Sequence, residues 1–349
     1  MAAWGIATLP YVGNYQLEEQ KMFTRKDFLT GGVALAAAGG VRCAVGATDS
    51  AKGAADAALA TPDVVFKDLQ TVKMLSGGGR VYALSSRIDS ISLSTVFVSP
   101  EGKILVVDGG HLAQGGDGKF LGDFLHKLGG HVDYWFITHA HGDHYGALVT
   151  MSEKPDFYGV TIGELIYNFP DIEWMLKREP GSRPYLTNFC DNVLGKCLKD
   201  VKRGDSSPGR VVNFGSWSFE ILNEPFLCDG NTINNASVMI SVKAGGKTWL
   251  ETGDLGLEAG HDAMKKLGQR LKHDIVFLAH HGQWAVDKAF YAAVAPEAAV
   301  WPLPSWLWDN RATNGTYGSG PYETNYTKCW MQELGVKKNY VLLKDYLFV

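Results

Sequence analysis

Three histidines and one aspartate lie close together in residues 138–144, which read Thr-His-Ala-His-Gly-Asp-His. His139 and His141 are two residues apart, so in an extended segment their side chains point to the same side. Asp143 and His144 follow at once and can turn toward a second point nearby. Imidazole and carboxylate ligands suit zinc, and also iron and manganese. This spacing predicts a metal site with two neighbouring positions.

The residues directly before this segment, 134–137, read Tyr-Trp-Phe-Ile. An aromatic and β-branched run bounded by polar residues predicts a short buried strand. The metal-ligating side chains are therefore expected at the carboxyl end of a strand, where α/β proteins usually place their sites.

Segment 138–144 resembles the HxHxDH signature of the metallo-β-lactamase superfamily. One further motif precedes this segment and two follow it, in the order expected for that superfamily. Residues 106–110 include Asp108, residues 251–255 include Asp254, and residues 279–283 include the pair His280 and His281. The resemblance implies an α/β fold, the four-layer αββα sandwich, over residues 63–349. It also implies two divalent metal ions, zinc or else manganese or iron, at one edge between the sheets.

The ligands that the resemblance implies are His139, His141, Asp143, His144, Asp254 and His281. In this assignment His139 and His141 bind the first metal, Asp143 and His144 bind the second, and Asp254 bridges both. His281 is preferred over His280 as the last ligand because a His-Gly pair matches the family's usual ending, but the opposite assignment stays open.

One of these ligands and four other residues are expected to have further roles at the site. Asp143 could accept a proton from the attacking water, and His280 is then a catalytic or substrate-contacting residue. Asp108 is expected to orient a metal ligand, and Asn235 and Ser237 are expected to lie behind the metal site.

One departure from the family pattern indicates which members of the superfamily the chain resembles. The lactamases carry another histidine ligand before the bridging aspartate, but residues 145–260 of this chain contain no histidine. Residues 234–240 read Asn-Asn-Ala-Ser-Val-Met-Ile in the corresponding place. This run is similar to the soluble hydrolase domain of the competence protein ComEC and to bacterial phosphorylcholine esterases. The first metal would then keep two imidazoles, Asp254 and water.

The metal chemistry points to hydrolysis. Two cations about 3.5–4 Å apart can supply hydroxide at neutral pH and stabilise the attacking and leaving oxygens of a phosphoryl centre. We therefore expect a phosphodiesterase that acts on a small-molecule or cell-wall-derived substrate. The alternatives are a carboxylic ester, thioester or lactone hydrolase, and a metal-dependent binding protein without turnover.

The N-terminal residues predict export. Residues 22–47 have a basic start, a short apolar run at 30–41 and a small-residue cleavage pattern near Ala47, which is the order of a signal peptide. Arg25 and Lys26 resemble a twin-arginine signal with lysine in the second position. Residues 1–21 lack export character and are expected to be a gene-start artefact, and residues 48–62 are expected to be a linker. The apolar run is too short to span a membrane.

Composition agrees with one large globular domain. The chain has 349 residues, 46% of them hydrophobic and 20% charged, which is ordinary for a globular protein. A formal net charge of −4 argues against broad nucleic-acid binding. Cys190, Cys197, Cys228 and Cys329 leave disulfides and free thiols both open. The aromatic residues of 301–322 leave two roles open, substrate stacking and packing.

Two local predictions can be compared with the structure. The pattern predicts helices over 184–202 and 257–267, and it places His126, His131, His261 and His273 at the surface.

Overall fold

Two mixed β-sheets form the centre of the part of the chain that the structure, a computed structural model, describes, which is residues 65–349. The predicted gene-start segment, export signal and linker (1–21, 22–47 and 48–62) lie outside these residues.

The first sheet joins the N-terminal strands of the described chain to its last strand. In pairing order it consists of β1 (Gln70–Val72), β15 (Tyr346–Phe348), β2 (Arg80–Ala83), β3 (Ser94–Val98), β4 (Ile104–Asp108), β5 (His131–Ile137), β6 (Thr161–Tyr167) and β7 (Lys202–Arg203). Strands β2, β3 and β4 pair antiparallel, and β4, β5, β6 and β7 pair parallel.

The second sheet also contains both antiparallel and parallel strand pairs. Its order is β14 (Lys338–Val341), β13 (Ala298–Trp301), β12 (Ile275–Phe277), β11 (Lys247–Glu251), β10 (Ile240–Ala244), β9 (Trp217–Ile221) and β8 (Val211–Phe214). Strands β8 to β11 pair antiparallel, and β11 to β14 pair parallel.

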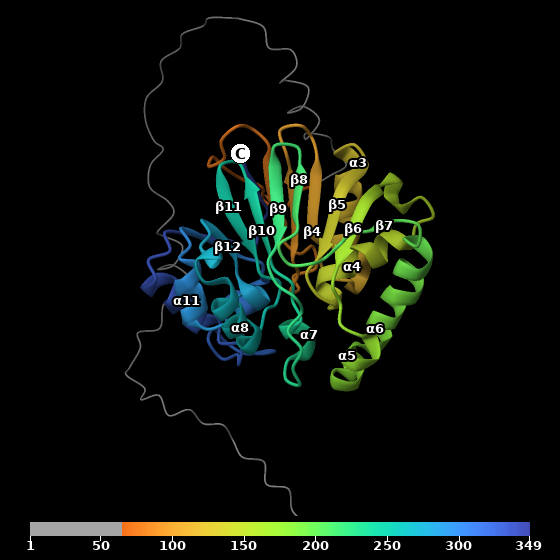
Figure 1. Cartoon of the computed structure of the whole chain (residues 1–349). Helices are drawn as coiled ribbons and strands as arrows, with labels where there is room; N and C mark the ends of the chain where they lie inside the picture. The colour runs from red at the N-terminus through yellow and green to blue at the C-terminus, as the bar shows by residue number, and fades with distance from the viewer. Residues whose placement is uncertain (1–64) are drawn as a thin grey trace, which may run out of the picture. The chain divides into compact units, whose positions relative to one another are not determined.

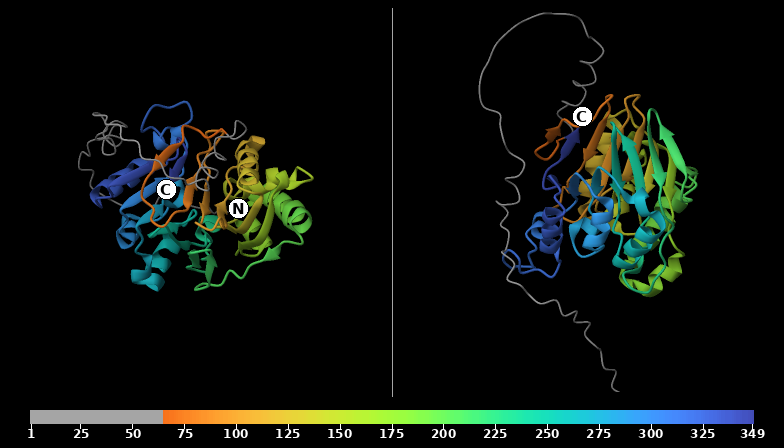
Figure 2. Two further views of the ribbon diagram at one scale, coloured as in Figure 1. Left: turned by 90° about the horizontal axis from the view of Figure 1, so that it is seen from above. Right: turned by 60° about the vertical axis from the view of Figure 1, so that its left-hand side comes forward.

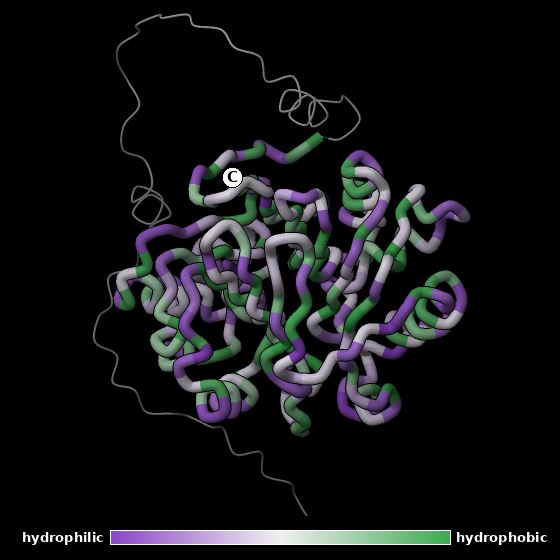
Figure 3. The backbone as a smooth tube through the Cα atoms, turned by 45° about the horizontal axis from the view of Figure 1, so that its top comes forward, coloured by the Kyte–Doolittle hydropathy of each residue, from purple (hydrophilic) through white to green (hydrophobic). Residues whose placement is uncertain are grey.

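Helices cover the outer face of each sheet, so the expected αββα arrangement is confirmed (Figures 1 and 2). The first sheet is covered by α3 (Gly116–Lys127), α4 (Gly142–Ser152), α5 (Ile172–Arg178), α6 (Arg183–Asn188) and a π-helix (Phe189–Cys197). Near the second sheet lie α7 (Thr232–Asn235), α8 (Leu257–Leu267), α9 (Lys288–Val294), α10 (Ser305–Trp308) and α11 (Thr324–Glu333). Figure 3 shows hydrophilic and hydrophobic residues alternating along the outlying helices, as expected for helices with one buried face.

Two separate apolar cores hold these layers together. Phe97, Phe136, Phe219 and Trp249 belong to the core between the two sheets. Other residues of the first sheet have side chains on its outer face. They pack against helix residues such as Phe124 and form the second core, outside that sheet. Because β4 faces apolar layers on both sides, all five of its residues are buried, and its sequence shows no polar alternation.

The parallel strands bring their carboxyl ends to the same edge of the molecule. Asp108 is the last residue of β4, and the other motifs with histidine and aspartate begin just after β5, β11 and β12. Chain segments from both sheets therefore meet at one edge, as the strand-end argument requires.

The structure confirms some of the local predictions and corrects others. Helix α8 spans the residues expected for it, 257–267. The helix expected over 184–202 is instead α6 followed by the π-helix, and it ends at Cys197 before the short strand β7. His273 was expected at the surface, which is wrong. It is buried, and its ring contacts Ser241 Oγ and the Leu271 carbonyl at 2.7 and 3.0 Å.

Cys190, Cys197, Cys228 and Cys329, the four cysteines in residues 65–349, are free thiols. Within the same range no helix is both long and apolar enough to cross a membrane.

Trp249 provides a test of the core between the sheets. Its fully buried ring contacts the rings of Phe97, Phe277 and Phe348, with centroids 5.9, 6.3 and 5.2 Å away. The Trp249→Ala variant should lose about 3–5 kcal/mol of unfolding free energy, because it leaves a cavity. Denaturant unfolding measures this, with Tyr326→Ala as the control. Tyr326 is 49% exposed, so its loss should change stability by less than about 0.5 kcal/mol.

Candidate metal centre

The HxHxDH segment crosses from the end of β5 into the start of α4. His139 stands in the short loop after β5, and His141 is the extended N-cap residue of α4. Asp143 and His144 lie in the first turn of α4. The change from extended to helical backbone explains why the two pairs face two different points.

The first group of ligand atoms is formed by two histidines and one carboxylate. His139 Nε2 lies 3.1 Å from His141 Nδ1 and 3.7 Å from Asp254 Oδ2. These three residues form one of the two groups in the described chain that can hold a metal ion.

The second group shares the same aspartate. His144 Nε2 lies 3.2 Å from Asp254 Oδ1. His281 Nε2 lies 2.9 Å from Asp143 Oδ2 and 3.5 Å from Asp254 Oδ2. Asp254 is therefore common to both groups and offers an oxygen to each.

His280 points toward the same centre although it belongs to neither group. Its Nε2 lies 3.9 Å from Asp254 Oδ2 and 3.3 Å from Asn234 Nδ2. The structure thus brings both histidines of the 280–281 pair to Asp254.

Acceptors behind the rings hold the outward nitrogens of three histidines. Nδ1 of His144 lies 2.7 Å from Asp108 Oδ2, and Nδ1 of His281 lies 2.7 Å from the Pro302 carbonyl oxygen. Nδ1 of His280 lies 2.8 Å from the Trp284 carbonyl oxygen. A carboxylate or carbonyl accepts only from a protonated nitrogen, so these contacts hold a proton on each outward Nδ1 and leave the inward Nε2 as the nitrogen that can bind a cation once it carries no proton.

Two observations test whether these residues fit metal ions. Two imidazole nitrogens bound to one tetrahedral zinc at about 2.0–2.1 Å lie roughly 3.3 Å apart, close to the separation of the His139 and His141 nitrogens. Among the described residues, the buried atoms His144 Nε2 and Asn234 Oδ1 have no hydrogen-bond partner. A cation would satisfy such atoms, so the residues fit.

The backbone at the centre adopts conformations that side chains rarely tolerate. His280 and His281 have φ values of 49° and 59°, a left-handed conformation that costs non-glycine residues energy. Gly253 has φ +55°, and a Cβ there would lie 2.8 Å from Thr138 Cβ. The short Thr-Gly-Asp turn therefore requires glycine in order to place Asp254 between the two groups.

Burial and opposite charges set the protonation of the centre. Burial lowers the pKa of His139 and of His280, so both rings are neutral. Burial also opposes charge on His281, but Asp254 and Asp143 raise its pKa to about 9. Burial alone would raise the pKa values of Asp143 and Asp254, yet the neighbouring imidazoles hold both below the usual range. The two carboxylates are therefore ionised, which favours a cation beside them.

The residues expected behind the ligands differ in what they contact. Asp108 accepts from His144 and also from the Thr138 backbone N–H and hydroxyl, at 2.8 Å each. The Ser237 hydroxyl accepts from the Asp254 backbone N–H at 3.1 Å. Asn235 instead joins α7 to α8, because its Oδ1 accepts from the Ala259 N–H.

Sequence reasoning missed Glu179, which lies beside His141. Its Oε2 is 3.1 Å from His141 Nε2, across 38 residues of chain. It also missed the carbonyl groups of Trp284 and Pro302. The sequence carries no signal for either kind of contact, because the partners are distant or belong to the backbone.

Two of the aromatic residues of 301–322 take the packing role that the sequence left open. Trp301 and Trp308 are buried and therefore pack the domain. Trp284, which precedes this region, is 47% exposed, and its ring lies 5.3 Å from that of His280.

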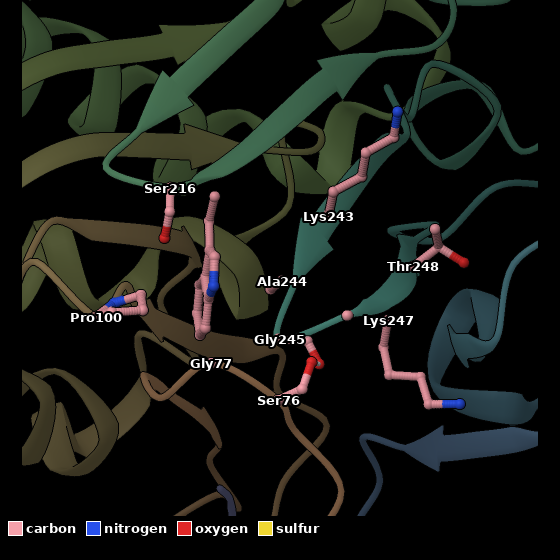
Figure 4. A pocket seen from close by; sticks show the side chains of 11 residues that line it. Ser76, Gly77, Pro100, Ser216, Lys243, Ala244, Gly245, Lys247 and Thr248 are labelled. Atoms are coloured by element: carbon pink, nitrogen blue, oxygen red, sulfur yellow. Dashed lines mark hydrogen bonds between the residues drawn. The ribbon is translucent and has the colours of Figure 1, made fainter.

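A separate hollow of about 410 Å³ lies away from the centre, at the opposite ends of β10 and β11 (Figure 4). Its lining includes Ser76, Trp217, Lys243 and Lys247 but none of the clustered histidines. It is therefore distinct from the candidate metal centre.

Comparison with known proteins agrees with the arrangement of the motifs. A family model described as the metallo-beta-lactamase superfamily matches residues 88–300. ComE operon protein 3 of Bacillus subtilis (strain 168) is 25% identical over 170 residues, which are 48% of this chain. The matched part is 20% of that relative, so the chain matches only about a fifth of its length.

Two solved structures show weak similarity. The metallo-beta-lactamase fold protein YhfI from Bacillus subtilis matches 78% of this chain and 100% of its own, with a TM-score of 0.44 and 8% identity. CmlA, a diiron beta-hydroxylase from Streptomyces venezuelae, matches 76% of this chain and 53% of its own, with a TM-score of 0.43 and 11% identity. Similarity at this level says nothing about the activity of the chain.

The contact between Asp108 and His144 provides a test of the second group. In an Asp108→Asn variant the amide would place N–H donors against the donors of His144 and Thr138. Metal affinity should fall by about 10–100-fold, because the ring of His144 is no longer oriented. Competition with a chelator measures the affinity. Asp123→Asn, in an exposed ion pair with Lys119, is the control, and equal affinities in both variants would contradict the role of Asp108.

Proposed function

Because the chain belongs to the metallo-beta-lactamase superfamily, we propose that it is a metal-dependent hydrolase with two divalent cations around Asp254. The observation that carries this proposal is the position of the Asp254 carboxylate, whose oxygens face both groups of imidazoles. No other aspartate or glutamate in the described chain belongs to both groups.

The first cation would be held by His139 Nε2, His141 Nδ1 and Asp254, with His280 Nε2 as a further ligand. Support for His280 comes from its ring orientation, since Nδ1 faces the Trp284 carbonyl and Nε2 faces Asp254. His280 thus supplies the imidazole that the 145–260 stretch lacks. Asn234 Oδ1 lies in the same region without a partner among the described residues.

The second cation would be held by Asp143, His144, Asp254 and His281. This keeps the preferred assignment of His281 as a ligand, and it gives His280 a ligand's role as well. The pair therefore serves both positions, one histidine each.

When bound, the two cations lower the pKa of water and stabilise negative charge on the oxygens of a phosphoryl centre. Asp143 Oδ2 faces His281, which leaves Oδ1 to accept a proton from the attacking water. The side chains of His141, Asp143 and His280 are 23, 11 and 11% exposed, whereas those of His139, His144 and His281 are fully buried. Substrate would approach from the side of the partly exposed residues.

Phosphodiesters are the proposed substrate class, as small molecules or parts of the cell wall. Support comes from the paired cation positions, which suit attack and departure of two oxygens at one phosphorus. Carboxylic esters, thioesters and lactones are the alternative substrates for the same centre. Export through residues 22–47 remains a prediction of the sequence.

Hydrolysis of bis(p-nitrophenyl) phosphate tests the proposed function. Chelation should lower turnover at least about 100-fold, because the cations contribute several kcal/mol of transition-state stabilisation. Added zinc or manganese should restore it. Added metal should not restore turnover in the Asp254→Asn variant. It should restore turnover fully in the control variant Asp262→Asn, since Asp262 belongs to an exposed ion pair on α8. Two bound ions without turnover would contradict the phosphodiester assignment and direct the search to carboxylic esters.

The role of His280 has its own test. His280→Ala should lower the number of tightly bound ions from two to one, because the first position loses an imidazole. Metal analysis after gel filtration measures the number. His131→Ala, at an exposed position on β5, should keep two ions. A His280→Ala protein that also keeps two ions at unchanged affinity would exclude His280 as a ligand.

A further inference from the structure

We propose that Glu179 is a positioning residue that sets which nitrogen of His141 faces the first metal position. The inference rests on the proposed metal centre and adds a residue from outside the superfamily motifs. Glu179 follows α5, in the stretch between β6 and β7.

His141 is oriented differently from the other histidines of the centre. His139, His144, His280 and His281 all direct Nε2 toward Asp254. His141 instead directs Nδ1 toward His139 Nε2, and its own Nε2 points away from Asp254 toward Glu179. For Nδ1 to bind a cation, the proton of the neutral ring must stay on Nε2.

Glu179 accepts from two donors at once. Its Oε2 lies 3.1 Å from His141 Nε2, and its Oε1 accepts from the Ile233 backbone N–H at 2.7 Å. The Ile233 N–H can only donate. A carboxylate accepts through both oxygens, so Glu179 holds the proton on His141 Nε2 while it binds the backbone of α7.

The surrounding chain holds Glu179 in this place. Pro180 follows it and prevents α5 from continuing. The preceding residue, Arg178, pairs with Asp229 at 2.7 Å and lies over the Trp174 ring at 4.2 Å. The side chain of Glu179 is only 27% exposed. Segments before and after the carboxylate are thus anchored, and the carboxylate joins α5, α7 and the HxHxDH loop.

Neither glutamine nor aspartate can replace Glu179 in these contacts. Glutamine offers one acceptor and one donor, so one of the two N–H groups would face another donor. Aspartate is one methylene shorter and cannot span the same two partners from the same backbone position. The structure therefore predicts that Glu179→Gln disturbs the first position and leaves the second intact.

Titration of the metal-free protein with Co²⁺ tests the inference, with the absorption spectrum of the ion as the readout. The unaltered protein should bind two ions. Glu179→Gln should bind one ion with unchanged affinity and the other about 10–100-fold more weakly, as expected when the partner of a ligating histidine is lost. Glu173→Gln is the matched control, since Glu173 lies on α5, the helix that Glu179 follows, pairs with Arg183 and is 75% exposed.

The outcomes separate this inference from the proposed function. If Glu179→Gln binds two ions as tightly as the Glu173→Gln control, the role of Glu179 is overturned and the metal centre stands. If the unaltered protein binds no Co²⁺, the metal centre itself is overturned.

A second measurement does not require the variant to fold. In the unaltered metal-free protein, the ring ¹⁵N shifts of His141 should show the proton on Nε2. A proton on Nδ1 would overturn the inference.

Discussion

The constraint on which the site depends is a single buried carboxylate that must serve two groups of imidazoles. Asp254 is 2% exposed and lies within 3.2–3.9 Å of nitrogens from four histidines. An ionised carboxylate in such a place is costly unless positive charge compensates it. In the proposed function, cations beside Asp254 provide that compensation, which would account for the convergence of these residues in the interior.

The two sheets meet this constraint through the ends of their parallel strands. Asp108 ends β4, the candidate ligands follow β5, β11 and β12, and the loop after β13 contains the Pro302 carbonyl. Each loop follows a buried strand, so the positions of the side chains are determined by the packing between the layers. The left-handed backbone at His280 and His281 is the conformational cost of turning adjacent residues toward one point.

The missing histidine is the feature that distinguishes this centre from the lactamase pattern. His280 and Asn234 lie where another ligand is needed, at 3.3 Å from each other. Glu179 lies on the opposite side of His141 from His139. In the proposed centre, the first metal position has contacts from the segments of α5 and α7, whereas the ligands of the second position all belong to the superfamily motifs.

The sequence by itself determined what depends on local spacing. The HxHxDH spacing and the helix over 257–267 follow from residues close together in the chain, whereas the αββα layers and the bridging role proposed for Asp254 follow from the resemblance of the ordered motifs to the superfamily. Tertiary structure decided how both His280 and His281 face Asp254, which nitrogen of each ring points inward, the burial of His273 and the contact of Glu179 with His141. These depend on carbonyl groups and side chains from distant segments, and only the packing of the two sheets brings those segments together.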